Sequence, residues 1–222
     1  MEEVTGKRKP KGPIKFQVTL TDEQKQAKAA ILDNTITVLK GSAGSGKSMV
    51  AAQVALDLLF RRDIQKIVLT RPAVTSGEDI GFLPGDKDAK LAPYTAAIYD
   101  NMYRLYKKEI IDKHIAEGNI EVIPLAFMRG RNLSDCFVVV DEAQNITHRQ
   151  MELLLGRLCN GAKMILCGDV AQIDLRDKKQ SGFDFVVKRL STIPGFGVIT
   201  LKTNHRHEIV EPILQVYNDY RD

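Results

Sequence analysis

One segment of the sequence combines glycines, a lysine and a serine in the order that phosphate binding requires. It fits the pattern GxxxxGK[ST] and comprises Gly41, Ser42, Ala43, Gly44, Ser45, Gly46, Lys47 and Ser48. Glycines let the backbone curl so that its N–H groups point at phosphate oxygens, and the N-terminus of a following helix adds partial positive charge. In such a loop Lys47 bridges the β- and γ-phosphates and Ser48 binds Mg²⁺. A glycine-rich turn that matches by chance is the alternative, and the strand and helix expected on either side argue against it.

Two acids follow directly after an apolar run at residues 137–140. Because an unpaired charge at the end of a buried strand is costly, Asp141 and Glu142 indicate a cation and a polar reaction partner. We expect Asp141 to be the second magnesium ligand. Glu142, on the other side of the extended backbone, is the candidate general base that accepts a proton from an attacking water. The alternative is that both acids cap the helix that begins near Thr147, although Asp141 lies too far upstream for that.

A third candidate lies after the next strand, in the segment 168–172. Gln172 offers both a hydrogen-bond donor and acceptors, so it could sense the γ-phosphate or the attacking water. The competing interpretation is a plain turn built on Gly168 and Asp169. We favour the functional role because the carboxyl ends of neighbouring strands converge in sheets of this kind.

The elements that position these residues alternate regularly along the chain. Short apolar, β-branched runs predict strands, and segments of helical period lie between them, which indicates an α/β fold with a central, mostly parallel sheet covered by helices on both faces. The predicted strands are 35–39, 66–70, 120–123, 137–140, 163–167 and, as a sixth candidate, 197–201. The predicted helices are 47–61, 92–108, 148–158, 183–190 and 208–220.

Composition limits the class of protein. The chain has 222 residues, 44% of them hydrophobic and 27% charged, which is typical of a globular domain and excludes fibre and disorder. No apolar run is long enough to cross a bilayer and no secretory signal is visible, so we expect a cytoplasmic location without a membrane partner. Most of the net charge of +4 lies in residues 1–15, which predicts a flexible basic arm that could approach phosphates.

These motifs together resemble the PhoH-like ATPases, whose core is RecA-like and related to superfamily 1 helicases. The resemblance runs from Leu20 to about Tyr217 and rests on six motifs in order: GSAGSGKS, LTRPAV, GFLPGD, PLAFMRGRNLSD, VVVDEAQN and GDVAQIDL. It implies one P-loop ATPase domain over residues 16–222, with ATP and Mg²⁺ as ligands. Two shorter stretches, LTDEQKQA and LKTNHRH, resemble helicase motifs. They imply that Gln24 reads the adenine edge and that Arg206 contacts the γ-phosphate, with a plain surface arginine as the alternative for Arg206. Arg71 could touch either the nucleotide or a nucleic-acid backbone.

The resemblance also implies a function: ATP hydrolysis coupled to RNA or single-stranded DNA. A helicase closes two RecA-like domains around ATP, and the second domain donates an arginine, whereas this sequence predicts one such domain. We therefore expect a homo-oligomer, with a hexameric ring favoured and Arg129, Arg131 or Arg176 as possible donors in trans. One alternative is a nucleotide-gated binding module with negligible turnover. Another is a small-molecule kinase, which the carboxylate at 142 and the GDxxQ segment disfavour.

An aromatic stripe offers a possible surface for nucleic acid. Tyr99, Tyr103 and Tyr106 share one helical face, with Arg104, Lys107 and Lys108 between them. Such a face could stack bases and neutralise phosphates. The same pattern arises when an amphipathic helix packs on its own sheet or on a neighbouring subunit, and we favour packing.

Overall fold

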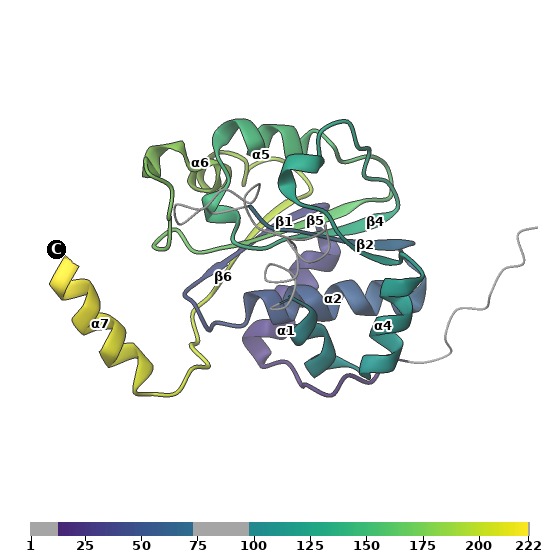
Figure 1. The fold of residues 1–222 in the computed structure, drawn as a ribbon, viewed down its shortest axis with the longest axis horizontal. Helices are drawn as coiled ribbons and strands as arrows, with labels where there is room; N and C mark the ends of the chain where they lie inside the picture. Colours follow the sequence, from purple (N-terminus) through teal and green to yellow (C-terminus); the bar gives the residue numbers. More distant parts are fainter. Residues whose placement is uncertain (1–12, 73–97, 222) are drawn as a thin grey trace, which may run out of the picture.

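The computed structural model describes residues 13–72 and 98–221. The predicted basic arm lies almost wholly outside the described residues, as does the GFLPGD motif at 81–86. The boundary between an arm and a domain therefore stays a prediction. Figure 1 shows the arrangement of the described elements.

Six strands form one sheet in the order β3-β2-β4-β5-β1-β6, and every neighbouring pair is parallel. The strands are β1 (Ile36–Gly41), β2 (Lys66–Thr70), β3 (Ile120–Val122), β4 (Cys136–Val140), β5 (Lys163–Gly168) and β6 (Phe196–Leu201). All six predicted strands are confirmed to within one or two residues, and the α/β fold class is confirmed with them. Because all strands are parallel, their carboxyl ends share one edge of the sheet.

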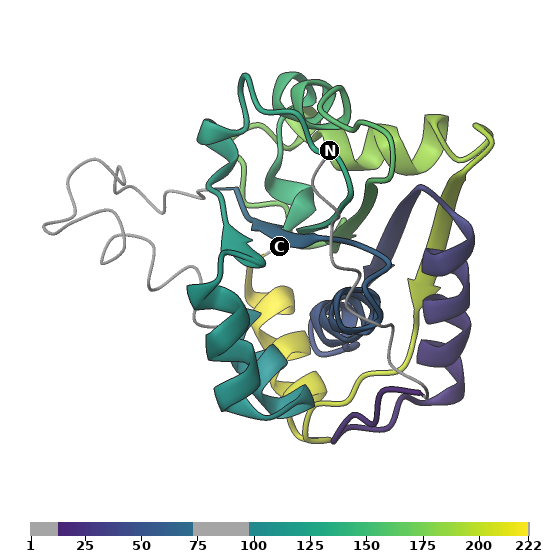
Figure 2. The ribbon, with the colours of Figure 1, turned by 90° about the vertical axis from the view of Figure 1, so that its right-hand side faces the viewer.

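The central strands are apolar on both faces because each face is covered. In β4, Phe137 and Val139 belong to one hydrophobic cluster, while Val138 and Val140 belong to the other. This is the period of two that a strand imposes on its side chains. Figure 2 shows α1, α2 and α4 on one side of the sheet and α6 on the other. The two layers of helices thus fix the sheet from both sides.

The helices are α1 (Asp22–Asp33), α2 (Lys47–Arg61), a helical stretch at 98–105, α4 (Lys108–Ala116), α5 (His148–Leu155), α6 (Gly182–Arg189) and α7 (Val210–Arg221). Short 3₁₀ turns occur at η2 (Leu125–Phe127), η3 (Ala143–Asn145) and η4 (Lys178–Gln180). None of the described helices is long and apolar enough to cross a membrane.

The helices differ from the sequence-based expectation at four points. No helix was predicted for α4 beyond residue 108, and α5 ends at Leu155, where Gly156 is its C-cap, instead of at residue 158. The sequence analysis assigned no helix to residues 22–33, yet α1 forms there and begins with a capping box in which Thr21 and Gln24 satisfy each other's backbone N–H groups. The continuous helix predicted for 92–108 is wrong where it is described. It ends after residue 105, because Lys107 has an extended ψ of 127° and then serves as the N-cap of α4.

Candidate nucleotide-binding site

A cavity of about 490 Å³ opens at the carboxyl edge of the sheet, where β1, β4 and β5 end side by side. The residues brought together there are those that the sequence analysis singled out on separate segments. Lining it are Gln24, Ala43, Gly44, Gly46, Lys47, Ser48, Asp141, Glu142, Gln172 and Arg206. The expected convergence of strand ends is thus present.

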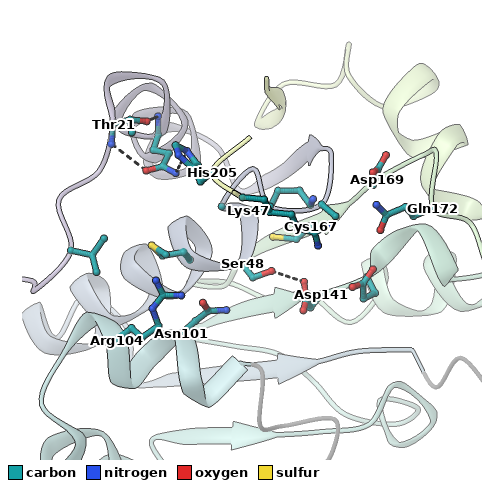
Figure 3. A pocket seen from close by; sticks show the side chains of 18 of the residues that line it. Thr21, Lys47, Ser48, Asn101, Arg104, Asp141, Cys167, Asp169, Gln172 and His205 are labelled. Atoms are coloured by element: carbon teal, nitrogen blue, oxygen red, sulfur yellow. Dashed lines mark hydrogen bonds between the residues drawn. The ribbon is translucent and has the colours of Figure 1, made fainter. Parts of the chain in front are cut away.

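The phosphate loop shapes one wall of this cavity (Figure 3). Gly44 and Gly46 have φ values of +85° and +88°, which L side chains rarely adopt. The Lys47 ammonium turns back onto the loop and donates to the carbonyl oxygens of Gly41 at 2.7 Å and Ser42 at 2.9 Å. Gly41, Ser42 and Ser45 do not line the cavity but form the curl itself, with the Ser45 side chain fully buried. The loop therefore presents backbone and one cation toward the cavity.

Ser48 and Asp141 join the phosphate loop to the end of β4. The Ser48 hydroxyl donates to Asp141 Oδ1 at 2.8 Å, a contact drawn in Figure 3. Asp141 is only 8% exposed, and this burial raises the pKa of its carboxyl, while the hydrogen bond from Ser48 works in the opposite direction. A buried carboxylate and a hydroxyl at hydrogen-bond distance are hard oxygen ligands, the kind that Mg²⁺ binds together with phosphate oxygens. The two side chains fit the predicted magnesium site.

Glu142 has an unusual backbone and two side-chain partners. Its φ of +52° and ψ of +39° place it in the left-handed region, which costs a non-glycine residue of order 1 kcal/mol and is commonest at functional sites. One carboxylate oxygen lies 3.5 Å from Arg71 Nη2, and the other accepts from Gln144 Nε2 at 2.6 Å. The alternative that the two acids cap a helix is wrong, because Thr147 caps α5 and forms a capping box with Gln150.

Gln144 is a residue of the site that the sequence analysis did not select. It is fully buried, and its amide nitrogen donates both to Glu142 and to the backbone carbonyl of Gln172 at 3.1 Å. Its amide oxygen accepts from the backbone N–H of Asp169 at 3.2 Å. Gln144 therefore connects the end of β4 with the loop after β5. Its position inside VVVDEAQN was visible, but which groups it bonds is not encoded in that motif.

Gln24 lies at the other end of the cavity, next to a histidine that the sequence analysis did not propose for the site. The Gln24 amide nitrogen is 3.2 Å from His205 Nε2, and its oxygen accepts from the backbone N–H of Thr21. Figure 3 shows Thr21, His205, Asn101 and Arg104 at this end, and Asp169 and Gln172 at the opposite end. Lys47 and Ser48 lie between these two groups of side chains in Figure 3.

The segment after β6 is attached to both the phosphate loop and α1. The backbone N–H of His205 donates to the backbone carbonyl of Gly44 at 3.0 Å. The Glu23 carboxylate accepts from the backbone N–H groups of Lys202 and Thr203. Arg206 lies against Gly44, since a Cβ on that glycine would come within 2.6 Å of Arg206 Cγ. Arg206 is exposed and lines the cavity, so it is available to a phosphate there.

Other residues line the cavity that were not proposed for the site from the sequence, although Thr21, Asp169 and His205 lie within the quoted motifs LTDEQKQA, GDVAQIDL and LKTNHRH. They are Val18, Thr19, Thr21, Met49, Asn101, Arg104, Cys167, Asp169 and His205. Several belong to the segment before α1 and to helix 98–105, which a backbone hydrogen bond from Gln17 to Leu105 holds together. Arg104 was noted in the aromatic stripe, but only the folded chain shows that it lines the cavity.

The arginines proposed as donors in trans do not line this cavity. Arg131 forms an ion pair of 2.9 Å with Glu121, whereas Arg129 and Arg176 are exposed and have no ion pair among the described residues.

The tyrosine stripe packs against the core, which is the interpretation that we favoured from the sequence. Tyr99, Tyr103 and Tyr106 are partly buried there, and the ring centroids of Tyr106 and Phe60 are 4.8 Å apart.

The fold and the phosphate loop define this chain as a P-loop nucleotide-binding protein with a RecA-like α/β sheet. It belongs to the PhoH-like protein family, which its sequence matches over residues 18–218. A PhoH-like protein of Mycobacterium bovis is 42% identical over 204 residues, which are 91% of this chain and 58% of the relative. One from Bacillus subtilis is 41% identical over 88% of this chain and 62% of the relative. The chain thus spans about 60% of the length of these relatives.

Solved structures share the fold at low sequence identity. The large terminase of a thermophilic bacteriophage superposes with a TM-score of 0.54 and 10% identity, over 89% of this chain and 50% of that one. The same terminase in complex with ADP gives a TM-score of 0.52 and 12% identity, with the same coverage. At such identities the similarity concerns the fold alone.

Proposed function

We propose that this chain is a Mg²⁺-dependent ATP hydrolase of PhoH type that couples turnover to RNA or single-stranded DNA. The observation that carries the proposal is the 2.8 Å hydrogen bond between Ser48 and Asp141. It brings the phosphate loop and the acids at the end of β4, which lie 93 positions apart, to the same point of the cavity. The ADP-bound terminase of the same fold supports a nucleotide as the ligand.

The binding roles follow from the contacts. Lys47 would exchange the carbonyls of Gly41 and Ser42 for phosphate oxygens, because a charged acceptor forms the stronger hydrogen bond. Ser48 and Asp141 would hold Mg²⁺, which neutralises charge on the phosphates when bound. Gln24 would read the adenine edge after it releases His205, since its amide can pair with both a donor and an acceptor of the base.

We assign the chemical steps to residues at the end of the cavity away from Gln24. Glu142 would take a proton from an attacking water, with Gln144 fixing one carboxylate oxygen and Arg71 the other. Gln172 and Arg206 would report the state of the γ-phosphate, because both line the cavity. The Arg71 contact supports a role at the catalytic carboxylate for that residue rather than direct contact with nucleic acid.

The proposal includes a homo-oligomer, favoured as a hexameric ring, in the cytoplasm. Its support in this chain is α7, which projects from the sheet in Figure 1. One stripe of α7 and the preceding turn is exposed and apolar: Ile209, Ile213, Val216, Tyr217 and Tyr220. Exposed apolar faces are typical of protein contacts, and a second copy is the partner that an arginine donated in trans would require.

The decisive experiment is the ATPase rate with and without single-stranded RNA or DNA, on a sample whose mass is known from light scattering. We expect Mg²⁺-dependent turnover that rises with nucleic acid. Lys47→Ala should lose ATP binding, since charge-assisted hydrogen bonds are worth about 1.5–3 kcal/mol each. ATP binding with negligible turnover under every condition would instead favour the nucleotide-gated binding module.

A further inference from the structure

A second, smaller pocket lies on the surface beside α6, away from the nucleotide cavity. It has a volume of about 270 Å³. It is formed by the start of α5, by η4 and by one face of α6, and its described lining residues are His148, Lys178, Lys179, Ser181, Asp184, Phe185, Lys188 and Arg189. Nothing in the proposed ATP hydrolysis uses these side chains.

The pocket concentrates positive charge. Four of its eight lining residues are cations, against the single carboxylate of Asp184, although the whole chain carries a net charge of only +4. Asp184 is already paired with Lys188 at 2.8 Å. Among the described residues, Lys178, Lys179 and Arg189 form no ion pair, so their charges are available to an anion. A strand of closely spaced phosphates is the ligand that such a cluster attracts most strongly.

An exposed aromatic side chain lies among these cations. Phe185 is 48% exposed, which is unusual for a phenylalanine, and its ring contacts that of His148 at 5.6 Å between centroids and an interplanar angle of 73°. A ring held by a neighbour yet open to solvent can stack a nucleobase, and cations beside it can bind the flanking phosphates. A free phosphate or an acidic peptide would leave the ring without a role.

The pocket is also connected to the catalytic end of the nucleotide cavity. Ser181, at its base, donates its hydroxyl to the backbone carbonyl of Gln144 at 2.7 Å. Gln144 in turn donates to Glu142 at 2.6 Å. The loop between Gln172 and η4 is held to η3 by a further pair of hydrogen bonds between Asn145 and Asp174. A ligand that shifts η4 or α6 would therefore move groups that position Glu142.

We infer that this pocket of η4 and α6 binds single-stranded nucleic acid, with a base stacked on Phe185 and phosphates on Lys178, Lys179 and Arg189. This deepens the proposed function, on which it rests for the kind of partner. The pocket of η4 and α6 then takes the place of the tyrosine stripe as the candidate surface for nucleic acid. In that stripe Tyr103 donates to Asp112, and burial together with this hydrogen bond raises the pKa of Tyr103 to about 12.

The test is binding of a fluorescent oligo(U) or oligo(dT) of about 20 nucleotides, long enough to cover one site of this kind, measured by anisotropy without nucleotide. Lys178→Glu combined with Lys179→Glu should weaken binding at least tenfold. The matched control is Lys107→Glu combined with Lys108→Glu, which makes the same charge change at the start of α4 and should bind like the wild type. The slope of log affinity against log salt should fall by about 1.4 in Lys178→Ala with Lys179→Ala, since each lost phosphate contact of a single strand contributes about 0.7.

The aromatic contribution is tested separately. Phe185→Ala should weaken binding by about 5- to 160-fold, the range expected for one lost stacked base, whereas Phe185→Tyr should retain affinity. The RNA and DNA arms show which strand is preferred. Equal competition by polyglutamate, with no effect of Phe185→Ala, would overturn the inference in favour of an acidic protein segment. Stronger losses in the Lys107 and Lys108 control than in the pocket variant would overturn it as well.

Turnover separates this inference from the proposed function. The Lys178→Glu, Lys179→Glu variant should hydrolyse ATP at the wild-type rate without nucleic acid and lose its stimulation by nucleic acid. Absence of hydrolysis in the wild type would refute the ATPase proposal. The binding measurements would still show whether the pocket of η4 and α6 binds nucleic acid. If nucleic acid stimulated ATP hydrolysis in the pocket variant as strongly as in the wild type, the inferred binding surface would be refuted and the ATPase proposal would stand.

Discussion

At the scale of single residues, the proposed role of Glu142 as general base predicts that ATP binding and turnover can be separated. Its carboxylate is held by Gln144 at 2.6 Å and lies 3.5 Å from Arg71, while its backbone is left-handed. Glu142→Gln keeps the shape and an acceptor for Gln144 but removes the base. We expect ATP affinity to change less than about threefold and turnover to fall about 10²- to 10⁴-fold, the usual contribution of a general base. Equilibrium binding and steady-state hydrolysis on the same preparation measure both, and unchanged hydrolysis would show that the base lies elsewhere.

In the ligand-free protein, the buried charge of Asp141 should lower the free energy of unfolding. Burial raises the pKa of this carboxyl above its ordinary value of 3.8, so the folded chain binds a proton more readily than the unfolded chain does. The protonated carboxyl therefore makes its whole contribution to the free energy of unfolding below pH 3.8. That contribution is lost as the pH rises through the raised pKa of the folded state. Asp141→Asn keeps an acceptor for Ser48 and removes the buried charge. At about pH 7 without ligands we expect it to increase the free energy of unfolding by about 1 kcal/mol and to abolish Mg²⁺-dependent nucleotide binding.

Thermal unfolding at several pH values checks this expectation. The wild type and Asp141→Asn should differ little near the ordinary pKa of an aspartate and diverge as the pH rises, provided both remain folded in that range. A variant that is less stable than the wild type at neutral pH would contradict the assignment of a net burial cost to Asp141.

The sequence predicts which residues meet at the ends of the strands better than it predicts the hydrogen bonds that they form there. Lys47, Ser48, Asp141 and Glu142 were identified because each lies in a short motif at the end of a strand, and parallel strands necessarily bring those ends together. Gln144 and His205 were not, because their contacts depend on tertiary distances: Gln24 and His205 are 181 positions apart. A local pattern does not encode which of several polar side chains will meet in the folded chain.

At the scale of elements, the same limit appears in the helices. The bounds of α2 agree with the prediction because a mostly apolar run, buried at every position from Val50 to Leu59, begins after the phosphate loop and ends at Arg61. Helix α1 was not predicted, since only Gln24, Ala27 and Ile31 are buried and the remaining positions are mostly polar. The break at Lys107 was also not visible, because Tyr106 continues the aromatic period while the backbone already turns toward α4. Tertiary packing, rather than propensity, decides such segments.

The contact between the phosphate loop and the segment after β6 can be tested as an element. In Gly44→Ala, the new Cβ would meet Arg206 Cγ at 2.6 Å and Asn204 Oδ1 at 2.7 Å, at a φ of +85°. Gly118→Ala is the matched control, since its φ is +70° but no atom lies within 4 Å of the new Cβ. Both variants should lose about 1 kcal/mol of unfolding free energy from the left-handed backbone. Only Gly44→Ala should also weaken ATP binding, by about tenfold or more, which corresponds to about 1.4 kcal/mol.

Calorimetric titration with ATP and denaturant unfolding give the two quantities. Equal ATP affinity in the two variants would mean that the Arg206 segment does not contribute to the nucleotide site.

At the scale of the whole molecule, Arg206 is an exposed arginine that lines the cavity and lies against Gly44 of the phosphate loop. An arginine donated in trans raises the rate of related enzymes by roughly 10³ to 10⁵, so an isolated copy should turn over slowly. Of the proposed donors, Arg131 is held by Glu121 at 2.9 Å, which leaves Arg129 and Arg176 as the better candidates. We expect specific activity to rise with protein concentration as copies assemble.

Mixing two inactive variants tests donation in trans directly. Arg129→Ala or Arg176→Ala should bind ATP but hydrolyse it at least about tenfold more slowly, and Glu142→Gln should be inactive while still offering its arginines. In a ring assembled from equal amounts, about a quarter of the sites would combine an intact Glu142 with an arginine from the neighbouring copy, because each subunit contributes one half of each interface. Activity should therefore reappear on mixing, and Arg131→Ala should behave like the wild type. Full activity in all three arginine variants, or fast turnover in a sample that light scattering shows to be monomeric, would mean that each copy completes its own site.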